Sequence, residues 1–177
     1  MSGELHSAKQ PVSAVLAGPY GHPFHPIVVT VPIGAWVSSL VFDVASHLVG
    51  DPSVLTAGSV WLIAIGVIGA VVAAMFGLLD LFAIPSGTRA FRIGLTHMSL
   101  NLGVTVAYAV NFVWRRGDYG RAETVAAGPL TLSVVSVCLL GAAGYLGGKL
   151  AFRYGVRVAA ETIQAEGFTP VAGAPGR

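Results

Sequence analysis

The chain has 177 residues, of which 54% are hydrophobic and only 10% are charged, and its mean hydropathy is +0.75. This composition leaves almost no material for a soluble domain. The net charge of +2 comes from a few scattered basic residues, which excludes a nucleic-acid-binding surface. Cys138 is the only cysteine, so no intramolecular disulfide can form.

Four long apolar segments follow one another along the chain, at residues 26–48, 57–80, 93–114 and 128–151. Each reaches the roughly 20 residues that cross about 30 Å of hydrocarbon at 1.5 Å per helical residue. They predict an all-α fold: an integral membrane four-helix bundle, surrounded by lipid, that occupies residues 22–154.

The flanking segments, residues 1–21 and 155–177, are expected to be disordered tails. The first of them has no apolar run of the kind that a cleavable signal peptide needs, so the first span is expected to act as its own insertion signal. The second begins as a plausible interfacial helix, VRVAAETIQAE. It continues as GFTPVAGAPGR, whose glycines and prolines cannot build a core.

Basic residues favour one orientation in the membrane. With four spans, the N-terminus, the 81–92 loop and the C-terminus share one side, which carries most of the basic residues: Lys9, Arg89, Arg92, Lys149, Arg153, Arg157 and Arg177, against Arg115, Arg116 and Arg121. The positive-inside bias therefore predicts that both termini are cytoplasmic. Trp61 and Trp114 fall at the opposite ends of their spans, where an outer aromatic belt is expected.

Small residues recur at helical spacing on three spans: Thr30, Gly34 and Ser38; Gly66, Ala70, Ala73 and Gly77; Gly144 and Gly148. Close backbone approach at small residues supplies much of helix packing in lipid, so these stripes indicate a tight bundle or a homodimer face. Alternatively, the glycines make room for a flat cofactor. Pro32 is expected to kink the first span, because it frees a backbone carbonyl.

One polar cluster is expected at the cytoplasmic ends of the first three spans. It contains His22, His25, Asp80 and His97, which antiparallel neighbours bring to one level. Imidazole and carboxylate groups from three helices suit a transition metal. Two of the imidazoles suit the axial positions of a b-type haem. In a purely structural reading, the N-terminal histidines bind headgroups and Asp80 pairs with basic residues of the 81–92 loop.

Two further polar patterns lie inside the spans. After His97, the residues Asn101, Thr105 and Tyr108 continue a stripe along one face of the third span, which must face the bundle interior or a cavity. On the first span Asp43 and His47 lie four residues apart. Such a carboxylate–imidazole pair is either a proton relay or a buried structural pair.

Three motifs resemble a bacterial family of four-span membrane proteins catalogued as domain of unknown function 2231: His22-Pro23-Phe24-His25-Pro26, Gly77-Leu78-Leu79-Asp80 and His97-Met98-Ser99-Leu100-Asn101. The resemblance covers roughly residues 20–155. Some relatives look to be fused to Rieske-type iron–sulphur domains, which implies work near electron transfer, although this chain lacks the cysteines for such a domain. The resemblance implies these motif positions: His22, His25, Asp43, Asp80, His97 and Asn101.

The leading hypothesis is a multi-pass protein of the bacterial inner membrane that binds a redox cofactor, b-type haem or else a transition metal, and serves electron transfer. His97 and His25 are the expected axial ligands, with His22 as the alternate. Asp80 and Asn101 are expected to fix the orientation of the imidazoles. A respiratory or redox membrane complex is the expected partner.

The alternative hypothesis is an accessory subunit of a larger respiratory or transport complex, with no cofactor and a structural polar core. A third hypothesis is a transporter or channel that uses Asp43 and His47. The sequence shows neither the inverted repeat nor the pair of broken helices that would support it. An enzyme is not expected, because no Ser or Cys nucleophile with an adjacent base follows from the spacing.

Overall fold

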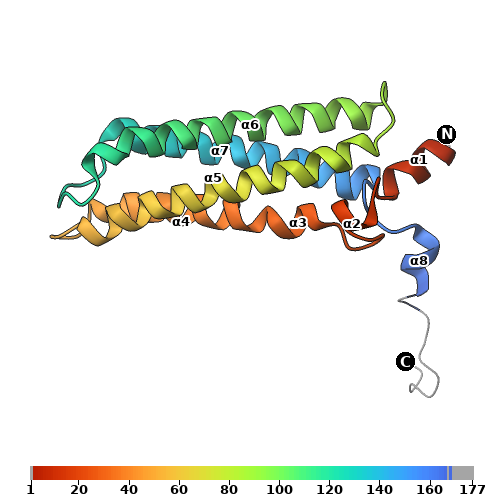
Figure 1. Cartoon of the computed structure of the whole chain (residues 1–177), viewed down its shortest axis with the longest axis horizontal. Coiled ribbons are helices and arrows are strands. Elements are labelled where there is room, and N and C mark those ends of the chain that lie inside the picture. Colours follow the sequence, from red (N-terminus) through yellow and green to blue (C-terminus); the bar gives the residue numbers. More distant parts are fainter. Residues whose placement is uncertain (1, 167, 169–177) are drawn as a thin grey trace, which may run out of the picture.

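The computed structural model describes residues 2–166 and residue 168, which form helices and loops with no strand. Four long rods lie side by side (Figure 1). The first rod has two parts, and the rods comprise these helices: α3 (Phe24–Val28) with α4 (Thr30–Ser46), α5 (Ser53–Phe82), α6 (Arg89–Arg115) and α7 (Ala127–Gly148). All four are long and apolar enough to cross a membrane. The predicted all-α four-span fold is confirmed.

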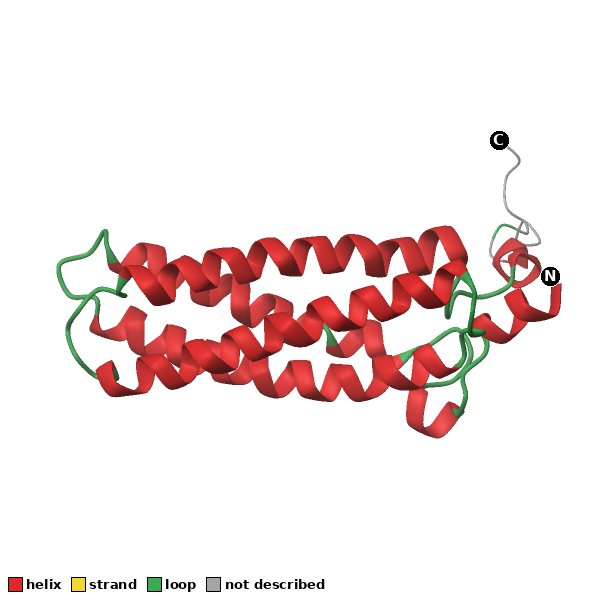
Figure 2. Ribbon diagram, turned by 90° about the horizontal axis from the view of Figure 1, so that it is seen from above, coloured by secondary structure: helices red, strands yellow, loops and turns green. Residues whose placement is uncertain are grey.

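The four rods form a square bundle. Helix α4 packs against α5 and α7, and α6 packs against the same two helices. The first and third spans therefore face each other diagonally across the bundle axis, as do the second and fourth. Figure 2 shows the long helices running alongside one another between the two ends of the bundle. Side chains that point inward from α3, α4 and α6 thus meet on the axis.

The bundle has a small core and an apolar outer surface. Trp36, Ile63, Val104 and Tyr108 make up the buried cluster at its centre. Large aliphatic side chains cover the outside of all four spans; Leu102, for example, is 63% exposed. Such an apolar surface is unfavourable in water and suits hydrocarbon, where helices satisfy their own backbone groups.

The first span is interrupted near its start. Helix α3 ends at Val28 and α4 begins at Thr30, with Val29 between them. Pro32 has no N–H to donate to the carbonyl of Val28, so the ladder of hydrogen bonds breaks there. The backbone N–H of Ile33 still donates to Val29 O at 3.2 Å. The expected effect of Pro32 is thus visible as a break between two helices.

Both terminal segments lie at one end of the bundle, called the terminal end below (Figure 1). They contain three short helices and a π-helical turn that extends the last span: α1 (Ser2–Lys9), α2 (Ala14–Ala17), α8 (Glu161–Glu166) and η2 (Lys149–Arg153). The N–H of Arg157 donates to Ala8 O at 3.0 Å, so the two segments are in contact. Most of the predicted disordered stretch at the C-terminus, residues 169–177, lies outside the described residues.

The opposite end, called the loop end below, carries the 47–52 loop and the segment that joins α6 to α7, which includes η1 (Arg116–Asp118). Trp61 and Trp114 are exposed there, and Trp61 Nε1 donates to the Tyr119 hydroxyl at 2.9 Å. Their position matches an interfacial aromatic belt.

A reporter fused to the C-terminus tests the predicted orientation. A fluorescent reporter that folds only in the cytoplasm is expected to be bright, and alkaline phosphatase, which is active only in the periplasm, is expected to be silent. The physical reason is the excess of basic residues at the terminal end. The reverse pattern would show that the termini lie on the other side of the membrane, but it would not change the number of spans.

Candidate functional site

His25 lies in the first turn of the first span, where Pro23 precedes α3 and Pro26 occupies a position that needs no backbone N–H. Its side chain reaches α5, and its Nδ1 lies 2.9 Å from Ala73 O. The imidazole packs directly on Gly77, one turn further along the same helix.

His97 makes the same arrangement with the other pair of helices. It lies on α6, and its Nδ1 is 2.8 Å from Ala143 O on α7. Its ring packs on Gly147, one turn beyond that carbonyl. Both imidazoles are half-buried.

The two backbone carbonyls determine the tautomer of each neutral ring. A carbonyl oxygen only accepts hydrogen bonds, so Nδ1 must carry the proton in both histidines. Nε2 then keeps its lone pair and is the nitrogen free to bind a metal. The Asn101 amide nitrogen lies 3.3 Å from each of the two ring nitrogens of His97 and donates to the His97 backbone carbonyl at 2.8 Å.

The two histidines come together across the bundle axis. Their ring centroids are 6.3 Å apart, and the ring planes are almost perpendicular, at 86°. The predicted proximity of His25 and His97 is confirmed, and its cause is the diagonal position of their helices.

Glycine is required beside each ring. A Cβ atom at Gly77 would lie 2.9 Å from Cε1 of His25, and one at Gly147 would lie 3.0 Å from Cε1 of His97. In the small-residue stripe on the second span, Gly77 therefore leaves room for the His25 ring. In contrast, Gly34 and Gly144 have nothing within 4 Å of an added Cβ. The stripes on the first and fourth spans do not pack inside the bundle at these positions.

The Gly77→Ala substitution is expected to push the His25 ring away from Ala73 and to lower the free energy of unfolding by about 1–3 kcal/mol, the usual result of overpacking. Gly144→Ala is the matched control, because it adds the same methyl group to open space and should change stability by less than about 1 kcal/mol. Thermal unfolding in detergent, followed by circular dichroism, measures both. Equal behaviour of the two variants would show that the histidine is not held as described.

The other predicted ligands do not join the pair. His22 is exposed in the turn before α3. Asp80 instead forms an ion pair with Arg157, with 2.8 Å between its Oδ1 and the arginine Nε. Among the described residues no three His, Cys, Asp or Glu side chains gather around a point that suits a metal ion. The expected metal site of His22, His25, Asp80 and His97 is therefore corrected to a histidine pair.

Asp43 is fully buried near the loop end, and its partner is Arg115 from α6. The two guanidinium nitrogens lie 2.8 and 3.2 Å from the two carboxylate oxygens, and Arg115 also donates to the Ser59 hydroxyl at 3.0 Å. Helix α4 ends at Ser46, so His47 is outside the helix and exposed. The predicted relay partner is thus exposed, whereas Asp43 is buried with Arg115.

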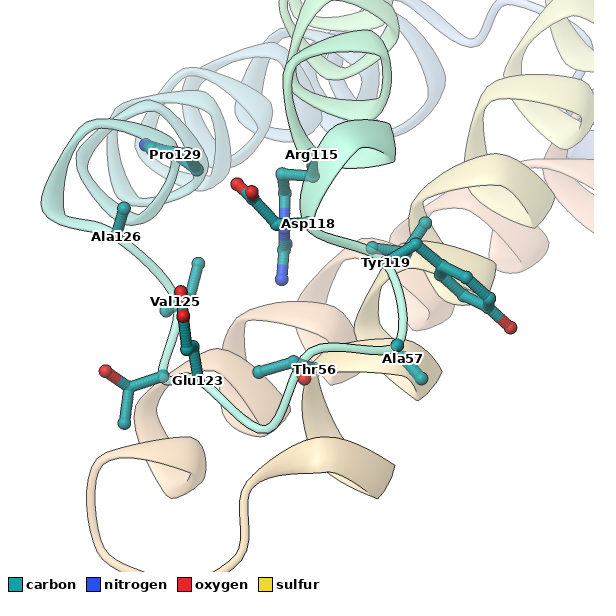
Figure 3. Close-up of a pocket in the computed structure, with 12 residues that line it drawn as sticks. Thr56, Ala57, Arg115, Asp118, Tyr119, Glu123, Val125, Ala126 and Pro129 are labelled. Atoms are coloured by element: carbon teal, nitrogen blue, oxygen red, sulfur yellow. The ribbon is translucent and has the colours of Figure 1, made fainter.

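A small cavity of about 70 Å³ lies beside this ion pair, under the segment that joins α6 to α7. Figure 3 shows the Arg115 side chain extending into it between Thr56 and Asp118. The volume suits a few water molecules. It is too small for a flat cofactor.

The first and third spans each carry three residues that face the bundle axis, and the sequence intervals between them are the same in both spans. These residues are His25, Trp36 and Asp43 on the first span, and His97, Tyr108 and Arg115 on the third. Each residue meets its counterpart. The histidines are adjacent, Trp36 stacks on Tyr108 with centroids 4.3 Å apart, and Asp43 binds Arg115. Three pairs are therefore layered along the bundle axis.

The second and fourth spans match in the same way. Trp36 Nε1 donates to Ile63 O and the Tyr108 hydroxyl to Ser133 O, each at 3.4 Å. Ile63 and Ser133 are separated by the same number of residues as Ala73 and Ala143, whose carbonyls bind the two histidines. The chain is thus two helical hairpins related by an approximate two-fold axis along the bundle, and the histidine pair lies on that axis.

The fold and this arrangement define a membrane-spanning four-helix bundle with a histidine pair between its diagonal first and third spans. A family model described as "Predicted membrane protein (DUF2231)" matches residues 21–160, and the chain belongs to this family. Nothing among curated proteins or solved structures matches the chain.

Proposed function

We propose that the chain binds one b-type haem between His25 and His97 and serves electron transfer in the membrane. The observation that carries this proposal is the geometry of the two imidazoles. Imidazole nitrogens bind first-row metals at about 2 Å, so two rings that share one metal from opposite sides have centroids about 6 Å apart. The measured separation is 6.3 Å.

The number of ligands favours haem over a bare metal ion. A structural or catalytic zinc site needs three or four protein ligands, and only two imidazoles meet here among the described residues. A haem iron already has four porphyrin nitrogens and takes only its axial ligands from the protein. A pair on an approximate two-fold axis supplies these equally from both hairpins.

The surrounding groups suit axial ligation. The carbonyls of Ala73 and Ala143 hold the imidazoles in one orientation and make Nε2 a better electron donor, the usual role of a hydrogen bond to the remote ring nitrogen. Asn101, which donates to His97 O at 2.8 Å, braces the second ligand. When bound, the haem would supply reversible one-electron chemistry at iron.

The cellular setting follows from the same proposal. A redox carrier with its histidine pair near the terminal end would exchange electrons on the side where both termini lie. We place that side in the cytoplasm and the protein in the inner membrane of a bacterium, with a respiratory or redox complex as partner. The excess of basic residues at that end supports the orientation.

Titration of purified apo-protein with ferric haem tests the proposal. The expected result is saturable binding at one haem per chain, with a Soret band typical of six-coordinate low-spin iron. Reduction with dithionite should then sharpen the α-band. Binding without saturation, or a five-coordinate spectrum in the wild type, would overturn bis-histidine ligation.

The second candidate is a cofactor-free accessory subunit of a larger respiratory or transport complex. Its support is that the polar side chains on the bundle axis already have partners within the protein: each imidazole has a carbonyl partner, and Asp43 has Arg115. The same titration separates the candidates. An accessory subunit would show no saturable haem binding and would co-purify with a larger membrane complex.

A further inference from the structure

Arg157 comes from the C-terminal segment and is drawn into the terminal end of the bundle. It is only 5% exposed, and its φ of 59° is a left-handed conformation that non-glycine residues rarely adopt. Its Nη2 donates to Ala17 O and Gly18 O, each at 3.0 Å, and its Nε is paired with Asp80. Three chain segments therefore converge on one guanidinium.

Two nitrogens of this guanidinium, Nε and Nη1, are buried without a hydrogen bond in the described part of the chain. Nε has its ion pair with Asp80, so Nη1 is the nitrogen that is left over. An unsatisfied donor on a buried cation is costly and rare. A planar guanidinium with a free nitrogen is also a preferred partner for a carboxylate.

The guanidinium stands close to the histidine pair on its terminal side. Asp80, which holds it, lies one turn of α5 beyond Gly77, the residue on which His25 packs. One turn corresponds to a rise of about 5 Å. A second cation is near: Lys9 Nζ donates to Ala159 O at 3.3 Å, and no carboxylate pairs with it within the described residues. This end of the site is therefore electropositive.

We propose that Nη1 of Arg157 binds a propionate carboxylate of the haem, so that the tetrapyrrole enters with its acidic edge toward the terminal end. This inference rests on the proposed function and adds that the site is specific for a tetrapyrrole with free carboxylates. Asp80 is then a positioning residue that orients the guanidinium.

Haem and its dimethyl ester, in which both propionates are blocked, provide the test. Wild-type apo-protein is expected to bind haem about tenfold or more tightly than the ester, the usual strength of a charge-assisted hydrogen bond in a protected site. The Arg157→Gln variant should lose that preference. Arg153→Gln, an exposed arginine on the same segment, should keep it.

The outcomes separate the two proposals. If the wild type binds neither compound, the haem proposal fails and this inference fails with it. If the wild type binds both compounds equally, or if Arg157→Gln keeps the preference, the haem proposal stands and the role of Arg157 is refuted. Equal binding of the two compounds by the wild type refutes the role of Arg157 even if the variant does not fold.

Discussion

The Asp43→Ala variant is expected to be about 3–5 kcal/mol less stable than the wild type, because it leaves the Arg115 guanidinium buried without its counter-charge. The carboxylate is fully buried, the arginine side chain is 6% exposed, and the two groups meet through a pair of hydrogen bonds. An unpaired charge buried inside a membrane-spanning bundle is costly. Unfolding in mixed micelles, followed by circular dichroism as sodium dodecyl sulfate is added, measures the loss.

Two controls accompany this variant. The double change Asp43→Leu with Arg115→Met removes both charges and should recover most of the stability, since apolar replacement of a buried pair is often neutral. Arg121→Ala breaks the exposed pair with Asp118 and should cost less than about 1 kcal/mol. An Asp43→Ala protein as stable as the Arg121→Ala protein would argue against the buried pair.

Exchange of either His25 or His97 for Ala is expected to abolish haem binding while the protein still inserts into the membrane. Each change removes one axial ligand outright, whereas the apolar spans drive insertion independently. The exposed histidines serve as matched controls, so His22→Ala and His47→Ala should keep full haem content. Haem per chain, from the pyridine haemochrome assay, is the measurement.

A graded effect is expected at the supporting residue. Asn101→Ala removes the amide that braces His97, and it should weaken haem binding by about 10–100-fold without eliminating it. Loss of haem from His22→Ala together with its retention in His25→Ala would reverse the assignment of the first ligand.

The span architecture could be predicted because hydrocarbon thickness limits it directly. A segment of about 20 apolar residues has the length of a helix that crosses the hydrocarbon layer. The proximity of His25 and His97 followed in turn, since four antiparallel rods bring the starts of the first and third spans to one level. Those steps need only lengths and directions.

The partners of Asp43 and Asp80 could not be predicted, because they depend on contacts between residues far apart in the sequence. Asp80 was expected to meet a metal or the 81–92 loop, and its actual partner, Arg157, arrives from a segment that folds back over the bundle end. Asp43 is buried with Arg115 as its partner, and His47, which follows the last residue of α4, is exposed. Arg115, counted from the sequence only among the basic residues outside the spans, turns inward and pairs with Asp43.

The sequence did contain a signal for the histidine pair and the buried arginine. The repeat in this chain is parallel and not inverted: the first and third spans carry their inward-facing residues at the same intervals. Comparison of those two spans in register would have aligned Asp43 with Arg115 and His25 with His97. It would also have separated His25 from His22, which has no counterpart at the matching position.

The absorption spectrum of the protein, purified in detergent from cells that were supplied with a haem precursor, tests the central claim most directly. The bis-histidine proposal predicts a Soret band in the oxidised protein, a sharp α-band after dithionite, and close to one haem per chain. A folded, monodisperse protein that is colourless in both states, and that takes up no haem on titration, would contradict it.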